Sequence, residues 1–160
     1  MSSPASIKGH PIHPMLVALP IGLWIFSLVC DLIYKGLGDQ IWDTMARYTI
    51  GGGIIGALLA AVPGIVDYKS LTDAKVTKIA TSHMTINLIV VALYAINLWL
   101  RTRNDLGDPL PALPFALSII AVVLLAISGW LGGEMIYVHG VAVEPQHDTE
   151  AEERAKDRIS

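Results

Sequence analysis

Four long runs without a charged residue constrain the fold of this chain more than any other feature of its sequence. Counted between charged residues, with His13 taken as the first boundary, the runs hold 17, 19, 22 and 25 residues, at 14–30, 48–66, 79–100 and 109–133. A helix needs about 20 apolar residues to cross a bilayer core of roughly 30 Å. Each run is therefore long enough for one membrane-spanning helix.

The four runs predict an all-α fold, a four-helix transmembrane bundle with up-down-up-down topology. We expect its helices over about 15–34, 42–67, 79–100 and 112–138. Four spans put both ends of the chain on one side of the membrane, which we call side A; the opposite end of the bundle is side B. Residues 1–143 then form a transmembrane domain, and residues 144–160 form a charged C-terminal tail.

The composition agrees with a lipid bilayer as the main surroundings of the chain. Of its 160 residues, 53% are hydrophobic and only 16% are charged, and the mean hydropathy is +0.55. A soluble domain of this size is less apolar. No basic patch indicates a nucleic-acid partner. The sequence also lacks a nucleophilic triad, a phosphate loop and a HExxH zinc motif, which argues against a hydrolase.

Three of the expected helices carry a stripe of residues at steps of three and four, the spacing of one helix face. Polar groups are costly in hydrocarbon, so a stripe that contains them is expected to face the bundle interior. Each stripe has a histidine at side A. The stripes are His13, Val17, Pro20, Trp24, Ser27 and Asp31; His83, Asn87, Val90, Tyr94, Asn97 and Arg101; and Ser118, Ala121, Leu125, Ser128, Gly132, Met135 and His139.

At side B the first two stripes end in opposite charges. Asp31 is expected to pair with Arg101 or with Arg47, because a single buried charge costs several kcal/mol. Asn87, Asn97 and Ser128 can hold helices together by hydrogen bonds worth about 0.6 kcal/mol each.

Four of the five histidines map to side A: His10, His13, His83 and His139. Glu134 stands about one turn inside the fourth helix at the same end; it is either a functional carboxylate or the partner of a neighbouring histidine or lysine. Histidines inside membrane bundles serve as axial ligands of haem, as ligands of a bare metal ion, or as proton carriers.

The sharpest hypothesis is a b-type haem at side A. Helices 1 and 3 are diagonal neighbours in an up-down-up-down bundle, so His13 and His83 can meet across its centre. His139 is the alternative to either ligand, or a hydrogen-bond partner for a propionate, and His10, which lies beside the site, is a further candidate cofactor-binding residue. The absence of a Cys-x-x-Cys-His motif makes the attachment non-covalent. The cations available to the propionates are Lys8, Lys75 and Lys78.

Two other classes of function stay open. In the first, His13, His83, His139 and Glu134 hold a transition metal in a non-haem binding or transport protein. In the second, the chain is a structural membrane module without a cofactor, and its small and polar residues serve only helix packing.

Three motifs resemble the bacterial membrane family named domain of unknown function 2231. They are Gly9-His10-Pro11-Ile12-His13-Pro14-Met15-Leu16-Val17, His83 with Asn87, and Gly129-Trp130-Leu131-Gly132-Gly133-Glu134 leading to Tyr137, His139 and Gly140. The resemblance implies a four-helix protein of the bacterial inner membrane without an assigned activity. Some relatives are joined to Rieske-type iron-sulfur domains, which implies an electron-transfer or redox subunit with an iron-sulfur partner rather than a stand-alone enzyme. Ala18 stands where many relatives have a further histidine, which puts a second site in doubt.

The basic residues predict the orientation only by a small margin. Four lie at side A and four at side B, and the tail adds Arg154, Lys156 and Arg158 to side A. Positive residues favour the cytoplasmic face, so we expect both termini in the cytoplasm.

Overall fold

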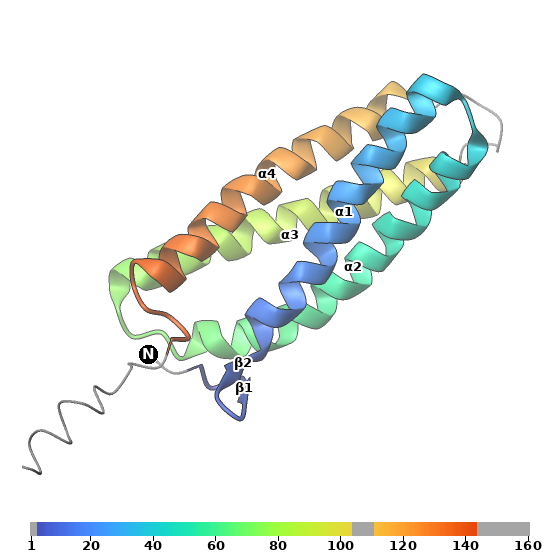
Figure 1. The fold of residues 1–160 in the computed structure, drawn as a ribbon. Helices are drawn as coiled ribbons and strands as arrows, with labels where there is room; N and C mark the ends of the chain where they lie inside the picture. The colour runs from blue at the N-terminus through green and yellow to red at the C-terminus, as the bar shows by residue number, and fades with distance from the viewer. Residues whose placement is uncertain (1–2, 104–110, 144–160) are drawn as a thin grey trace, which may run out of the picture.

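The computed structural model describes residues 3–103 and 111–143, and within them the chain forms four long helices (Figure 1). This confirms the predicted four-helix fold. The charged tail at 144–160 lies outside the described residues. A two-stranded hairpin of β1 (Ser6–Ile7) and β2 (His10–Pro11) precedes the helices, which are α1 (Ile12–Leu37), α2 (Gln40–Lys69), α3 (Ala74–Arg103) and α4 (Ala112–Tyr137).

All four helices are long and apolar enough to cross a membrane. They hold 26, 30, 30 and 26 residues, and the mean hydropathy of their most apolar windows runs from 1.7 to 2.4. At 1.5 Å per residue even the shorter pair exceeds the roughly 30 Å of a bilayer core. Large apolar side chains such as Ile55, Leu88 and Val123 are exposed on the outer faces, where lipid contacts a membrane protein. The chain is therefore a multi-pass integral membrane protein.

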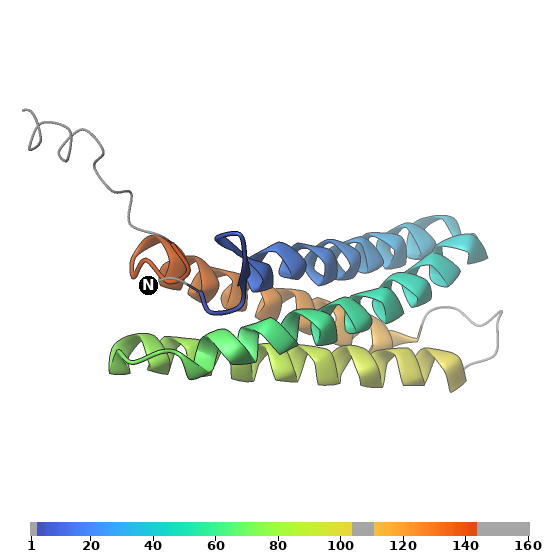
Figure 2. The same cartoon turned by 90° about the horizontal axis from the view of Figure 1, so that it is seen from below.

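The bundle consists of two helical hairpins. α1 packs most extensively against α2, and α3 against α4, whereas the contacts of α2 with α3 and of α1 with α4 are sparser. α1 and α3 therefore lie on a diagonal, as the topology predicts. Figures 1 and 2 show the four helices running side by side along one axis. Ser3 lines a pocket together with Val141 and Ala142, so both ends of the described chain lie at side A.

Most helices extend beyond the apolar runs, and residues outside those runs cap three of the helix ends. At side B, Gly38 ends α1 with a φ of 71° and donates its N–H to the carbonyl of Tyr34, while the Asp39 carboxylate accepts the N–H of Ile41 at 3.0 Å to begin α2. At side A, Asp73 accepts the N–H groups of Lys75 and Val76 at 2.8 and 2.9 Å and begins α3. α3 therefore starts at Ala74, about one turn before the expected residue 79.

The centre of the bundle is apolar and includes a stacked aromatic pair. The rings of Trp24 and Tyr94 lie 4.5 Å apart at an interplanar angle of 11°. A Cβ added to Gly53 would clash with Nε1 of Trp24, so only glycine leaves room for this indole on α2. The core residues, Trp24, Ile50, Val90, Tyr94, Ala121 and Leu125, include members of all three predicted stripes, which confirms that these faces point inward.

Candidate functional site

Two histidines from diagonal helices meet at side A. His13 lies in the first turn of α1 and His83 in the third turn of α3. Their ring centroids are 6.4 Å apart and their planes are nearly perpendicular, at 87°. Both side chains are half-buried. The structure thus brings together the two residues that head the first two stripes, and we call them the histidine pair.

The ring of His13 rests on α2, in a place that a glycine leaves open. Its Nδ1 lies 2.8 Å from the carbonyl oxygen of Ala60. A Cβ added to Gly64 would stand 2.8 Å from the same nitrogen and 2.9 Å from Cε1. Such distances are too short for real Cβ contacts, so any larger residue at 64 must displace the imidazole or α2. Gly64 is therefore part of the His13 seat.

The ring of His83 rests on α4 in a corresponding way. Its Nδ1 lies 2.9 Å from the carbonyl oxygen of Ser128 and 3.0 Å from the hydroxyl of the same residue. The amide of Asn87 donates to that hydroxyl at 2.6 Å and to the His83 carbonyl at 2.8 Å. Gly132 leaves room beside the ring, because an added Cβ would be 3.4 Å from Cε1. The expected helix-holding role of Asn87 and Ser128 is confirmed, and it fixes the ring as well.

These hydrogen bonds determine the tautomer of both rings. A carbonyl oxygen only accepts, so Nδ1 of each histidine must carry the proton and donate it. The neutral ring then has its lone pair on Nε2. Among the described residues neither Nε2 has a hydrogen-bond partner. A histidine that donates one nitrogen to a backbone carbonyl and keeps the other free has the arrangement of a metal ligand.

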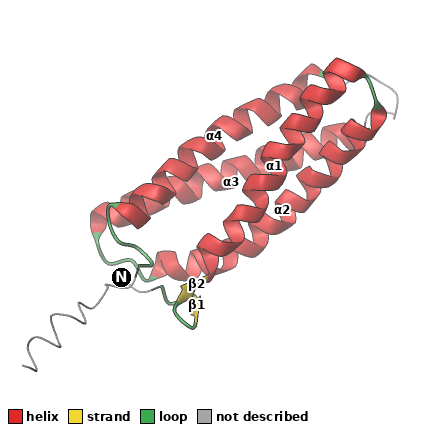
Figure 3. Cartoon of the chain, viewed as in Figure 1, coloured by secondary structure: helices red, strands yellow, loops and turns green. Residues whose placement is uncertain are grey.

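His10 is not part of this arrangement. It lies on β2, two residues before the start of α1 (Figure 3). The turn before it places Lys8 at φ 50° and Gly9 at φ 79°, the positive values of a two-residue hairpin loop. The exposed ring bonds to the carbonyl of Lys8 through Nδ1 at 3.0 Å. His10 therefore stands at the surface of side A.

His139 and Glu134 are half-buried near the end of α4, and neither is joined to the histidine pair. His139 lies two residues beyond the end of α4, and its N–H donates to the Glu134 carbonyl at 3.3 Å. Its Nε2 is buried and has no partner in the described part of the chain. The Glu134 carboxylate forms no ion pair with a histidine or lysine there, in contrast to one of its two expected roles. Within residues 3–103 and 111–143, no three histidine, cysteine or acidic side chains gather as a metal site.

Charged groups surround this end of the bundle. Lys8, Lys75 and Lys78 are exposed, the last two in the first turns of α3. Asp73 caps the same helix, and the N–H groups of Val76 and Lys75 that donate to it hold its pKa below the usual value, with a smaller contribution from His139. The lysines are thus available to an anionic group, whereas Asp73 is engaged in capping.

The polar residues at side B form a closed network instead. Arg101 donates to both carboxylate oxygens of Asp31, at 2.8 and 2.6 Å, and to Asp43 at 3.3 Å. The side chains of Asp31 and Arg101 are 0% exposed. Asn97 accepts from Nε of Arg101 at 2.7 Å. Of the two expected partners, Asp31 therefore pairs with Arg101.

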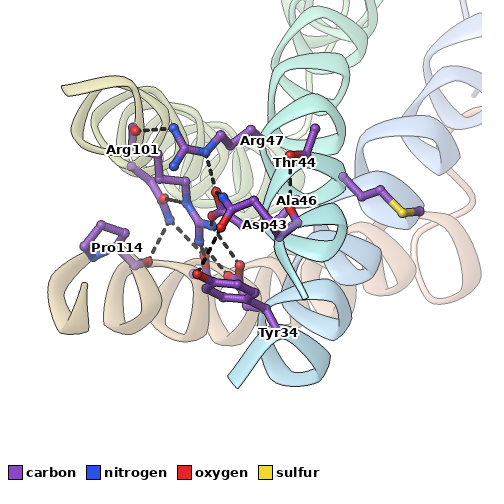
Figure 4. A network of polar contacts seen from close by, with 12 residues as sticks. Tyr34, Asp43, Thr44, Ala46, Arg47, Arg101 and Pro114 are labelled. Carbon is purple, nitrogen blue, oxygen red and sulfur yellow. Dashed lines mark hydrogen bonds and ion pairs between the residues drawn. The ribbon is translucent and has the colours of Figure 1, made fainter. Parts of the chain in front are cut away.

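Arg47 completes this network from α2. It donates to Asp43 at 2.7 Å and to the backbone carbonyl of Arg101. Figure 4 shows Arg47, Asp43 and Arg101 converging where α2 and α3 approach each other. Two carboxylates face two guanidinium groups, so the charges balance, and helix α4 joins through Ser118 and the Pro114 carbonyl. The spacing of Asp43 and Arg47 by four residues was the available sequence signal for this second pair.

The comparisons with known proteins give one match. A family described as "predicted membrane protein (DUF2231)" matches residues 9–145. No curated protein and no solved structure matches the chain.

Proposed function

The chain belongs to the DUF2231 family of predicted membrane proteins, and we propose that this member binds one b-type haem through His13 and His83 and carries electrons. The observation that carries the proposal is the histidine pair, in which two diagonal helices present imidazoles whose Nδ1 atoms are held and whose Nε2 atoms are free. Haem iron in membrane bundles takes such axial ligands.

The separation of the two rings supports a shared ion. Imidazole nitrogen binds a metal ion at about 2 Å, so two rings on opposite sides of one ion have centroids roughly 6 Å apart. The observed separation is 6.4 Å. Both hydrogen bonds to carbonyl oxygens would raise the basicity of the ligating nitrogens, as second-shell partners do.

The number of ligands favours haem over a bare ion. A six-coordinate haem iron takes two ligands from the protein, and the described residues bring two imidazoles together. The two imidazoles belong to different helical hairpins. A haem bound between them would therefore disturb the sparse contacts between the hairpins and leave the extensive contacts within each hairpin intact. Lys8, Lys75 and Lys78 are exposed at the same end and can pair with propionates.

The haem would supply one-electron redox chemistry, and the residues of the chain orient and enclose it. The histidine pair lies in the first turn of α1 and the third turn of α3, in the side A part of the bundle. A redox partner such as an iron-sulfur protein can approach closely there. We therefore propose a role as a subunit of an electron-transfer system in the bacterial inner membrane.

Absorption spectra test this proposal. The full chain is purified from haem-replete cells, and spectra are recorded before and after dithionite. We expect a Soret band that shifts on reduction, and its loss in His13→Ala and in His83→Ala. His10→Ala removes an exposed histidine from the same segment and should leave the spectrum unchanged. A colourless preparation, or a Soret band that survives in both ligand variants, would exclude the assignment.

A non-haem metal site is the second candidate, and the orphan Nε2 of His139 favours it. This buried nitrogen has no partner in the described part of the chain and lies at the same end of the bundle as the histidine pair. With Glu134 it could complete a site for a transition metal. Elemental analysis of the same sample decides between haem and a non-haem metal. One zinc or copper ion per chain in a colourless protein would support the non-haem metal site and exclude haem.

A further inference from the structure

A pocket at side A, separate from the histidine pair, carries its own chemistry. Its volume is about 280 Å³, and it lies among three segments: the N-terminal residues, the connection from α2 to α3, and the residues that follow α4. We call it the Asp67 pocket. Its polar wall consists of Ser3, Asp67, Ser70 and Thr72.

The Asp67 carboxylate is half-buried, and its hydrogen bonds involve one oxygen. Oδ1 accepts the hydroxyl of Ser3 at 2.6 Å and the N–H of Ala5 at 3.1 Å. Neither a lysine, an arginine nor a histidine of the described residues pairs with Asp67. A partly buried carboxylate is stabilised by a cation, and the contacts leave Oδ2 free to bind one.

Two of the three hydroxyl groups of the pocket, those of Ser3 and Ser70, present acceptors rather than donors. Ser3 uses its proton on the Asp67 carboxylate, and Ser70 donates its proton to the Asp67 carbonyl at 2.7 Å. Their oxygen lone pairs therefore remain available. Such a wall, with a carboxylate at its centre, repels anions and accepts N–H donors.

The remaining wall of the pocket is apolar, which favours an organic cation over a metal ion. It is formed by Pro4, Leu71, Val141 and Ala142. Calcium takes six to eight oxygen ligands, usually with several carboxylates, and this pocket has one carboxylate. A primary ammonium group has three N–H donors, and the carbon atoms attached to it can contact the apolar wall.

We propose that the Asp67 pocket binds a primary ammonium group, supplied either by a soluble amine or by the ethanolamine headgroup of a phospholipid at the membrane surface. The Asp67 carboxylate pairs with the ammonium, and the oxygens of Ser3 and Ser70 accept further N–H groups. This proposal does not depend on haem binding.

The experiment follows the thermal unfolding midpoint of the full chain in detergent during titration with ethanolamine. A ligand that binds the folded state raises the midpoint, and the rise grows with the logarithm of ligand concentration once that concentration exceeds Kd. We expect a rise with ethanolamine and none with tetramethylammonium, which has the same charge but no N–H donor. An equal rise with tetramethylammonium, or a response to calcium and not to ethanolamine, would overturn the proposal.

Substitutions in the pocket test whether ethanolamine binds at Asp67. Asp67→Asn keeps an acceptor for Ser3 and Ala5 but removes the charge, and should weaken ethanolamine binding about tenfold or more. Ser70→Ala, which removes one acceptor, should weaken it by about twofold to tenfold. The control is Asp73→Asn, an exposed carboxylate at the same end, which should bind as the native chain does. Unchanged affinity in both pocket variants would contradict the proposed site.

Nanodiscs distinguish the two sources of the ammonium group. A midpoint higher in phosphatidylethanolamine than in phosphatidylcholine, with the difference lost in Asp67→Asn, assigns the pocket to the lipid headgroup. A response to soluble ethanolamine with no difference between the two lipids assigns it to a soluble amine.

Discussion

The two ends of the bundle use the same inward-facing stripes in opposite ways. At side B, Asp31 and Arg101 are fully buried, the four charges of their network with Asp43 and Arg47 are all paired, and all four helices contribute to it. At side A, His13 and His83 are half-buried, and each is held through one ring nitrogen while the other stays free. A buried polar group whose bonding capacity is used up stabilises the fold, whereas one with a fixed orientation and a free lone pair can bind a ligand.

The largest effect is expected from breaking side B. Arg101→Met leaves the buried carboxylate of Asp31 without its cation, which should lower the free energy of unfolding by about 3–5 kcal/mol. Adding Asp31→Asn should recover part of the loss, because the unpaired charge is then removed. Denaturant unfolding in detergent measures both variants. Losses that simply add would show that the two residues are not coupled.

At side A we expect Gly64→Ala to act through the histidine pair. The new Cβ would stand 2.8 Å from Nδ1 of His13, so the ring must move, at a cost of about 1–3 kcal/mol. The haem Soret band should weaken in parallel. Gly129→Ala is the matched control, since a Cβ there meets nothing within 4 Å on α4. Comparable losses of the Soret band in the two variants would contradict the His13 seat.

Substitutions of two asparagines on α3, one at each end of the bundle, distinguish the roles of side A and side B. Asn97→Ala removes the acceptor of Arg101 and should destabilise the fold by about 1–3 kcal/mol while leaving haem affinity unchanged. Asn87→Ala releases Ser128 beside His83 and should lower haem affinity about 10- to 100-fold, with a smaller loss of stability. Haem titration and unfolding of each variant test this. If both variants mainly lower haem affinity, or both mainly lower the free energy of unfolding, the proposed difference between the two ends is wrong.

The smallest effect concerns the cap of α3. The pKa of Asp73 is lower in the folded chain than its ordinary value of 3.8, so its contribution to stability is complete above that value and is lost as the pH falls through the lower folded pKa. Asp73→Ala should lower the unfolding midpoint slightly at pH 7. As the pH is lowered into the acid range, the midpoint of the variant should fall less steeply than that of the native chain. A thermal scan at several pH values shows whether the variant and the native chain converge at low pH.

Much of this arrangement follows from the sequence, because charge is expensive in a membrane. Runs without charged residues predict the spans, and the spacing of polar residues within the runs predicts the inward faces. The same reasoning predicts that Asp31 needs a partner, and Arg101 lies at the corresponding depth on the diagonal helix. The pairing of side chains from α1 and α3 at both ends follows from topology and periodicity together.

Other features depend on backbone geometry that periodicity does not describe. α4 ends at Tyr137, so its stripe cannot be continued to His139, whose position is set by a turn. The hairpin at Lys8 and Gly9 likewise determines where His10 points. Asp43 stands at the beginning of a helix, where its sequence position predicts capping and does not reveal that it shares Arg101 with Asp31. The cytoplasmic placement of the termini stays a prediction.

The electron paramagnetic resonance spectrum of the oxidised protein tests the central claim most directly. Two imidazoles on one ferric haem make the iron low-spin, and their planes set the anisotropy of the signal. The rings of His13 and His83 are 87° apart, so we predict the strongly anisotropic low-spin signal of nearly perpendicular ligand planes. This signal should be absent from both His13→Ala and His83→Ala and present in His10→Ala. A high-spin signal in the native protein, or a low-spin signal that either ligand variant retains, would contradict ligation by the histidine pair.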